Sequence, residues 1–330
     1  MFSAIIDPNS YHGKNKKSNF FEGWYYKLVE PLKGEAYCFI PGIFFSDTKE
    51  YSHSFIQVII SKDNNYEYLK YNKDEFIASS SEFILNIDKN YFSLTQIDIN
   101  LVKPNINIFG TLFFNNIIKW PDTIINPGSM GFYNYFNFMQ CYSQVCALDG
   151  NIIGKLYINN EMVDFTGGKI YIEKNWGKSF PSSYIWLQAN SFTKEETSVT
   201  CSIGAIPIPF SSRSFTGFLI GISVKGMVFK FTSINRSKLI VSFENEDIEL
   251  KVYNKNYLLL IKATYNKNNF MNLYAPISNE MIPMAKETLT GIIAIKLIDK
   301  KKNCNITEGI SYSAAIEVCG NYFNMSKKFV

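Results

Sequence analysis

The stretch KIYIEKNWGKSFPSSYIWLQANSF, residues 169–192, holds two short strand-forming runs joined by Gly-Lys-Ser-Phe-Pro. Successive side chains of a strand point to opposite faces of its sheet. The first run therefore puts Tyr171, Glu173 and Asn175 on one face and Trp176 on the other. A carboxyl, an amide and aromatic rings thus lie close together, and the rest of the chain is interpreted around them.

The second run places aromatic rings beside amides, because Tyr184, Trp186, Gln188 and Asn190 share one face. Large aromatic surfaces with a few fixed polar groups are typical of the wall of a small-molecule pocket. The same pattern also fits a buried sheet whose polar groups are satisfied by backbone partners at the turn. The composition does not separate these two interpretations.

The overall composition favours β-structure, because 16% of the 330 residues are aromatic and only 19% are charged. The net charge of +4 is mild and not clustered, which argues against nucleic-acid binding. Two histidines and six scattered cysteines without a CxxC pair argue against a metal site and predict reduced thiols. The N-terminal residues do not resemble a signal peptide, and no apolar run is long enough to span a membrane. We therefore expect a cytoplasmic protein.

Short β-forming runs follow one another along the whole chain, roughly twenty of them, which is too many for one small barrel. We predict an all-β fold of two antiparallel barrels or sandwiches, with one domain over residues 1–165 and the other over 166–330. The dipeptide Asp149-Gly150 predicts a hairpin turn. One short helix is expected around residues 280–289.

Several motifs together resemble those of the tocopherol cyclase-like proteins. The longest is YIEKNWGKSFPSSYIWLQANSF, and FEGWYYK at residues 21–27 is similar to the family's opening motif. Three further stretches fall in the expected order: FMQCYSQVCALDG at 138–150, IGAIP at 203–207 and AIEVCG at 315–320. The resemblance extends over nearly the full length of the chain.

This resemblance implies two lipocalin-like domains, related to those of carotenoid hydratases. It also implies a cyclase or isomerase that needs no cofactor or metal and acts on a hydrophobic, prenylated small molecule. A non-catalytic lipid- or isoprenoid-binding protein is an alternative, and a carbohydrate-binding β-sandwich is another. The partners that we expect are the hydrophobic ligand and a membrane surface for ligand exchange, with no nucleic acid and no obligate protein partner.

One strand departs from the family pattern. Bacterial members have Glu and His where this chain carries Gln140 and Ser143. Glutamine cannot donate a catalytic proton, and serine cannot replace an imidazole base without help. If those positions are catalytic in the relatives, this chain is altered in activity or only binds its ligand. If they are structural, Gln140 and Ser143 keep the hydrogen bonding.

Ring closure on a prenylated quinol needs an acid that protonates an alkene and a base that takes the phenolic proton. A carboxyl in a dry, aromatic site can serve as that acid, and aromatic faces stabilise a developing cation. We predict Glu173, Asn175 and Tyr142 as catalytic residues. A buried ion pair is the alternative for Glu173 and the favoured interpretation for Glu22 and Glu317, with Lys27, Lys174 and Arg213 as candidate cations. The predicted substrate contacts are Trp24, Tyr26, Gln140, Trp176, Trp186, Gln188 and Asn190. We expect Trp24, Tyr142, Trp186 and Gln188 to approach one internal cavity.

Overall fold

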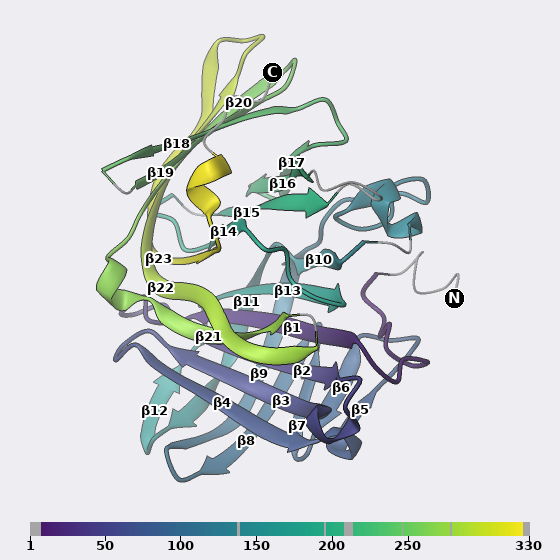
Figure 1. Ribbon diagram of the computed structural model, residues 1–330. Helices are drawn as coiled ribbons and strands as arrows, with labels where there is room; N and C mark the ends of the chain where they lie inside the picture. Colours follow the sequence, from purple (N-terminus) through teal and green to yellow (C-terminus); the bar gives the residue numbers. More distant parts are fainter. Residues whose placement is uncertain are drawn as a thin grey trace. The chain divides into compact units, whose positions relative to one another are not determined.

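The computed structural model describes residues 8–136, 139–194, 196–207, 214–245, 247–277 and 279–325. The chain divides into two compact units (Figure 1). The first comprises the residues up to Phe180 together with Leu273–Pro283, and the second comprises Pro181–Asn272 and the residues from Met284 onward. The strand β13 (Lys169–Gly177) therefore belongs to the first unit, although its residues fall in the range 166–330 predicted for the second domain.

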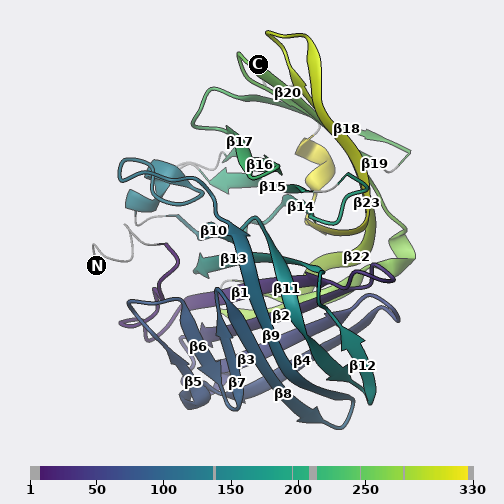
Figure 2. The ribbon, with the colours of Figure 1, turned by 180° about the vertical axis from the view of Figure 1, so that it is seen from behind.

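The first sheet has 13 strands, all of whose pairs are antiparallel. Its path is β4-β3-β2-β1-β13-β11-β9-β8-β7-β6-β5, with β10 paired to β13 and β12 to β11. Figure 1 and, from behind, Figure 2 show the sheet curling so that β3 comes near β6. Besides β13, its strands are β1 (Phe20–Val29), β2 (Ala36–Phe45), β3 (His53–Ile60), β4 (Asn65–Asn72), β5 (Phe76–Ala78), β6 (Ile84–Ile87), β7 (Asn90–Ser93), β8 (Gln96–Lys103), β9 (Ile106–Ile118), β10 (Cys141–Ala147), β11 (Asp149–Ile158) and β12 (Glu161–Asp164).

The second sheet has 10 strands in the order β17-β16-β15-β14-β23-β22-β20-β19-β18, with β21 paired to β22. Its strands are β14 (Tyr184–Ala189), β15 (Thr197–Pro207), β16 (Ser214–Val224), β17 (Met227–Thr232), β18 (Lys238–Glu244), β19 (Asp247–Tyr253), β20 (Tyr257–Thr264), β21 (Met271–Ile277), β22 (Glu280–Asp299) and β23 (Cys304–Cys319). Five short 3₁₀ turns complete the regular structure of the described residues: η1 (Lys49–Tyr51), η2 (Lys73–Glu75), η3 (Gly131–Tyr135), η4 (Lys267–Asn269) and η5 (Tyr322–Met325). The predicted all-β, lipocalin-like fold is confirmed.

Each unit has an apolar core of its own. In the first unit the core lies inside the curled sheet and includes Trp24, Tyr26, Ile170 and Ile172. In the second unit the core takes Ile185, Leu187 and Ala189 from β14, with residues of the other strands. The alternation of β13 and β14 thus leaves Glu173 on the face of its sheet opposite the first core and Trp186 opposite the second.

Two predicted local features are wrong. Residues 280–289 form the start of β22, in which residues 286–288 pair with β23 and Glu287 lies opposite Glu317. Pro283 opposes a helix there, because it cannot donate a backbone hydrogen bond. Asp149 and Gly150 do not form the predicted hairpin turn. They begin β11, and Asp149 pairs with β9, so the chain does not turn back onto β10. Among the described residues, no helix is long and apolar enough to cross a membrane.

Candidate functional site

Glu173 lies at the centre of a buried polar network on β13. Its side chain is 2% exposed. Tyr171 donates a hydrogen bond to Glu173 Oε2 at 2.5 Å, and Ser143 of β10 donates to Glu173 Oε1 at 2.9 Å. The amide of Asn175 donates to the same Oε1 at 3.3 Å. The predicted face of Tyr171, Glu173 and Asn175 is therefore confirmed, and the amide contacts the carboxyl directly.

The strand pairing explains why Ser143 reaches Glu173. In the β10–β13 register Ser143 lies opposite Asn175, so its side chain is on the face of Glu173 and next to it. Burial raises the pKa of the Cys141 thiol on β10. Cys141 is therefore a neutral thiol at physiological pH and not a competing nucleophile.

This arrangement can move a proton. An ionised carboxylate only accepts hydrogen bonds, whereas the hydroxyl groups of Tyr171 and Ser143 both donate and accept. When Glu173 gives up a proton, these hydroxyl groups and the Asn175 amide stabilise the carboxylate that remains. The network thus has the parts of a proton donor and acceptor in a water-poor environment.

The third predicted catalytic residue, Tyr142, does not join this network. It lies opposite Trp176 in the strand register, and its ring stacks on the Trp176 ring with centroids 5.4 Å apart. Its hydroxyl donates to the carbonyl of Phe136. Tyr142 and Trp176 therefore share the face of β13 opposite to Glu173.

That opposite face carries a second network, centred on Glu22. The Glu22 carboxylate and the Lys174 ammonium are 2.8 Å apart, and both side chains are 0% exposed. His12 contributes its backbone N–H at 2.9 Å and its Nδ1 at 3.1 Å from the Glu22 oxygens. The prediction of a buried ion pair for Glu22 is confirmed, with Lys174 as the cation.

Aromatic rings surround this ion pair. The Lys174 ammonium lies 5.4 Å from the ring centre of Trp24 and 5.0 Å from that of Trp176. His12 stacks on Trp176 at 4.0 Å. Burial acts to raise the pKa of Glu22, but Lys174 and His12 outweigh it and hold that pKa below its ordinary value. Glu22 is thus an anion held by its partners, unlike the free acid that a proton donor must be.

Two other predicted substrate contacts of the first unit make internal hydrogen bonds. The hydroxyl of Tyr26 donates to the Ser93 carbonyl at 3.0 Å within the barrel core. The amide of Gln140 donates to the Phe180 carbonyl at 3.1 Å, which anchors β10 to the turn after β13. The Gln140 side chain therefore has a structural role in this fold.

The remaining predicted contacts lie in the second unit. All three are buried: Trp186 is 8%, Gln188 0% and Asn190 1% exposed. Trp186 and Gln188 lie on the face of β14 opposite the second core. Tyr184, on the same face, donates to Glu317 of β23. Burial, and then the charge of Glu317, raise the pKa of the Tyr184 hydroxyl. The four residues expected at one cavity are divided between the units: Trp24 and Tyr142 belong to the first, and Trp186 and Gln188 to the second. Their common cavity therefore stays a prediction.

Sequence reasoning missed two partners of the two carboxylates, Ser143 and His12. Ser143 was noted as a departure but not as a partner of Glu173, and His12 lies in a segment without any strand signal. Lys174 was only one of three candidate cations. The alternation of β13 could have indicated Lys174, because it places this residue beside Trp176, whereas no local pattern predicts His12. The third candidate cation, Arg213, lies outside the described residues.

Comparison with known proteins gives consistent results. A model of the tocopherol cyclase-like family matches residues 112–320. A probable tocopherol cyclase of rice chloroplasts (Oryza sativa subsp. japonica) is 25% identical over 97% of this chain and 80% of its own length. The chloroplast tocopherol cyclase of Zea mays is also 25% identical, over 97% of this chain and 79% of its own length.

Two solved structures share the fold at low sequence identity. CghA, solved with Sch210972, has a TM-score of 0.57 and 8% identity and covers 91% of this chain and 88% of its own. An AttH candidate protein from Nitrosomonas europaea has a TM-score of 0.53 and 11% identity, with 91% and 92% coverage. Both support the fold alone.

Proposed function

This chain belongs to the tocopherol cyclase-like family, and on that premise we propose that it is a cyclase or isomerase of a hydrophobic, prenylated small molecule, with Glu173 as the proton-transferring residue. The reaction is an isomerisation, so no atom enters or leaves the substrate overall. It requires no redox step and is proposed to proceed without a cofactor. The curated relatives that carry the name tocopherol cyclase support the substrate class.

The network around Glu173 is the observation that carries this proposal. The proton of the Glu173 carboxyl adds to one carbon of a prenyl double bond, which leaves a carbocation at the neighbouring carbon. The phenolic oxygen of the same molecule attacks that cation and closes the ring, and its proton returns to the carboxylate. Ser143 and Tyr171, both within 2.9 Å of Glu173, stabilise the carboxylate between these two steps.

Asn175 has a positioning role in this scheme. Its amide donates to Glu173 Oε1 at 3.3 Å, the same oxygen that accepts from Ser143. Two donors on Oε1 fix the orientation of the carboxyl plane, and therefore the direction in which its proton is delivered. Tyr142, on the opposite face of β13, is proposed as a packing partner of Trp176 instead of a proton donor.

The carbohydrate-binding alternative has no support from the tryptophans. An exposed aromatic platform would favour sugars, but Trp24, Trp120, Trp176 and Trp186 are between 1% and 8% exposed. A carrier without turnover is the remaining alternative, and the activity test separates it from the enzyme.

The test measures ring closure of a prenylated hydroquinone in D₂O. We expect the wild-type protein to form a chromanol that carries one deuterium on carbon, because the proton added to the alkene comes from solvent by way of Glu173. Glu173→Gln keeps the shape of the side chain but removes the acid, so the rate should fall by about 10²–10⁴. Mass spectrometry of the product and the melting temperature are measured on the same samples.

Glu161→Gln is the matched control, because Glu161 is an exposed carboxylate on β12 and undergoes the same chemical change. It should leave the rate unchanged. A Glu173→Gln protein that is folded and turns over at the wild-type rate would remove Glu173 from the mechanism. Tight binding of the hydroquinone without any product from wild type would identify a carrier.

A further inference from the structure

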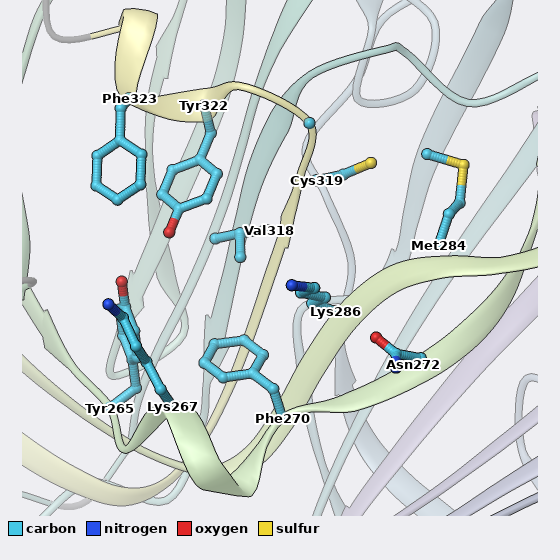
Figure 3. Close-up of a pocket in the computed structure, with 11 residues that line it drawn as sticks. Tyr265, Lys267, Phe270, Asn272, Met284, Lys286, Val318, Cys319, Tyr322 and Phe323 are labelled. Carbon is cyan, nitrogen blue, oxygen red and sulfur yellow. The ribbon is translucent and has the colours of Figure 1, made fainter.

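A pocket of about 530 Å³ lies within the second unit, whereas the residues of the proposed mechanism belong to the first. The β20–β21 connection, β22, the end of β23 and the 3₁₀ turn η5 form its walls (Figure 3). Its volume is within the range of ligand sites, which is roughly 300–1,000 Å³. The pocket is therefore large enough for a small organic molecule.

Four of the eleven residues that line this pocket are aromatic. Tyr265, Phe270, Tyr322 and Phe323 contribute rings. Tyr265 and Phe270 meet edge to face at 5.1 Å, and Tyr322 and Phe323 stack at 4.3 Å. Figure 3 shows Phe270 and Tyr322 on opposite sides of the pocket. An apolar or aromatic body fits between such walls.

The interior surface is formed by buried residues. Val318 is 4% and Cys319 3% exposed, and both come from the end of β23. Burial, and then the charge of Glu317, raise the pKa of the Cys319 thiol to about 11. The thiol is therefore neutral at pH 7 and adds weakly polar surface without charge.

The charge of the pocket has one sign. Lys267 and Lys286 both line it, and the described lining residues include no aspartate or glutamate. Figure 3 shows the Lys286 side chain directed toward the middle of the pocket, between Phe270 and the Val318–Cys319 surface. The exposed Asn272 adds an amide at the edge. A single anionic group on an otherwise apolar ligand matches this distribution.

We propose that this pocket is a binding site for an apolar carboxylate, with Lys286 as the main contact of the carboxylate group. The apolar body lies between Phe270 and Tyr322, and the Lys286 ammonium donates to the carboxylate oxygens. This site is separate from the proposed ring-closing chemistry and does not depend on it. It gives the second unit a ligand function of its own.

Calorimetric titration of the whole protein tests the site with two carboxylates. 2-Naphthoate represents an aromatic ligand and decanoate an aliphatic one, and we expect at least one of them to bind with a Kd below about 1 mM. Stronger binding of 2-naphthoate would indicate that the ligand is an aromatic carboxylate, and stronger binding of decanoate would indicate a fatty acid. 2-Naphthalenemethanol has the same rings without the charge and should bind at least tenfold more weakly, since a hydrogen bond between charged groups is worth about that factor.

Charge reversal locates the binding site. Lys286→Glu should weaken binding of the stronger carboxylate by more than about tenfold, because it replaces the cation with an anion. Lys251→Glu is the matched control: Lys251 is exposed on β19 and is not among the pocket residues. It should leave binding unchanged. Met284→Trp fills the pocket without changing its charge and should also weaken binding.

Three results would overturn the proposal. The first is no binding of either carboxylate at about 1 mM. The second is equal binding by Lys286→Glu and Lys251→Glu, which would place the ligand elsewhere. The third is equal affinity for 2-naphthoate and 2-naphthalenemethanol, which would leave the lysines without a role. Melting temperatures of all variants exclude unfolding as the cause of a loss, and ring-closing activity, measured in parallel, should not change.

Discussion

At the scale of single residues, β13 holds two carboxyl networks with opposite character. Glu173 is bound by hydroxyl and amide donors, whereas Glu22 on the paired strand β1 is bound by the Lys174 ammonium. A carboxylate opposite an ammonium is fixed in its charged form, whereas a carboxyl group among neutral hydroxyl and amide donors has no cation that holds it ionised. This difference is why Glu173 is proposed for proton transfer and Glu22 for stability.

The Glu22 network predicts how stability depends on pH. Because the pKa of Glu22 in the folded protein is below its ordinary value of 4.5, the ion pair contributes stability above about pH 4.5 and loses it as the pH falls through the lower, folded pKa. Glu22→Gln leaves Lys174 buried beside a neutral amide, so this variant should be less stable at pH 7. The difference in free energy of unfolding between wild type and variant should shrink as the pH falls.

Urea unfolding between pH 7 and pH 3 measures that difference. Asp164→Asn is the comparison, because the pKa of Asp164 is also lowered, by hydrogen bonds from Thr166, but its side chain is 38% exposed. Its effect should be small at every pH. A Glu22→Gln difference that stays constant down to pH 3 would mean that the Glu22 charge does not stabilise the fold.

At the scale of elements, the sequence predicted short strands along the whole chain from runs rich in aromatic and β-branched residues. The strands β1 (FFEGWYYKLV), β2 (AYCFIPGIFF) and β17 (MVFKFT) are runs of this kind. The sequence failed where tertiary pairing overrides local signals. Asp149-Gly150 has the composition of a turn, but pairing with β9 keeps it in a strand, and β4 carries too many polar residues to be recognised.

The end of β13 makes a specific prediction about the β10–β13 pair. Gly177 has a φ of +147°, and a Cβ added there would lie 2.3 Å from the carbonyl oxygen of Gln140. Gly177→Ala therefore forces backbone to move, which should cost about 1–3 kcal/mol and disturb the placement of Ser143 beside Glu173. Thermal unfolding measures the cost, and ring-closing activity reports the placement.

Gly167→Ala separates the cost of backbone strain from the cost of a steric clash of the added Cβ. Gly167 also has a positive φ, +88°, but nothing lies within 4 Å of the added Cβ. This substitution should cost only the strain of a left-handed residue, about 1–2 kcal/mol, and leave activity unchanged. Equal losses of stability and activity in both variants would show that Gly177 is not required for close approach to Gln140.

At the scale of the whole molecule, the two units are not consecutive along the chain. The chain leaves the first unit after Phe180 and returns to it at Leu273–Pro283 before it completes the second unit. No sequence pattern predicted this return, because the contacts of the segment in the first unit are with residues distant in sequence. The site prediction has the same limit. The alternation of β13 placed Glu173 beside Asn175, but the contact of Glu173 with Ser143 of β10 and that of Lys174 with Glu22 of β1 depend on strand pairing.

The returning segment predicts that the first unit is incomplete when the chain ends at Phe180. Tyr274 stacks on Tyr68 at 4.4 Å, and its carbonyl and N–H bond to Gln57 and Tyr66. Asn279 accepts from Asp47 N–H at 2.7 Å. We expect a fragment of residues 8–180 to unfold at a lower temperature than the same residues in the full chain, since it loses these hydrogen bonds and the ring contact.

A synthetic peptide of residues 271–285 provides the complementary experiment. Added in excess, it should bind the fragment and raise its melting temperature in a concentration-dependent way, because a ligand that binds only the folded state stabilises it. A peptide in which alanine replaces Tyr274 and Asn279 should have a much weaker effect, because it lacks the ring that stacks on Tyr68 and the amide that bonds to Asp47. If the fragment melts at the temperature of the full chain and ignores the peptide, then the first unit is complete at Phe180, and the return of the chain is not needed to stabilise the unit that carries Glu173.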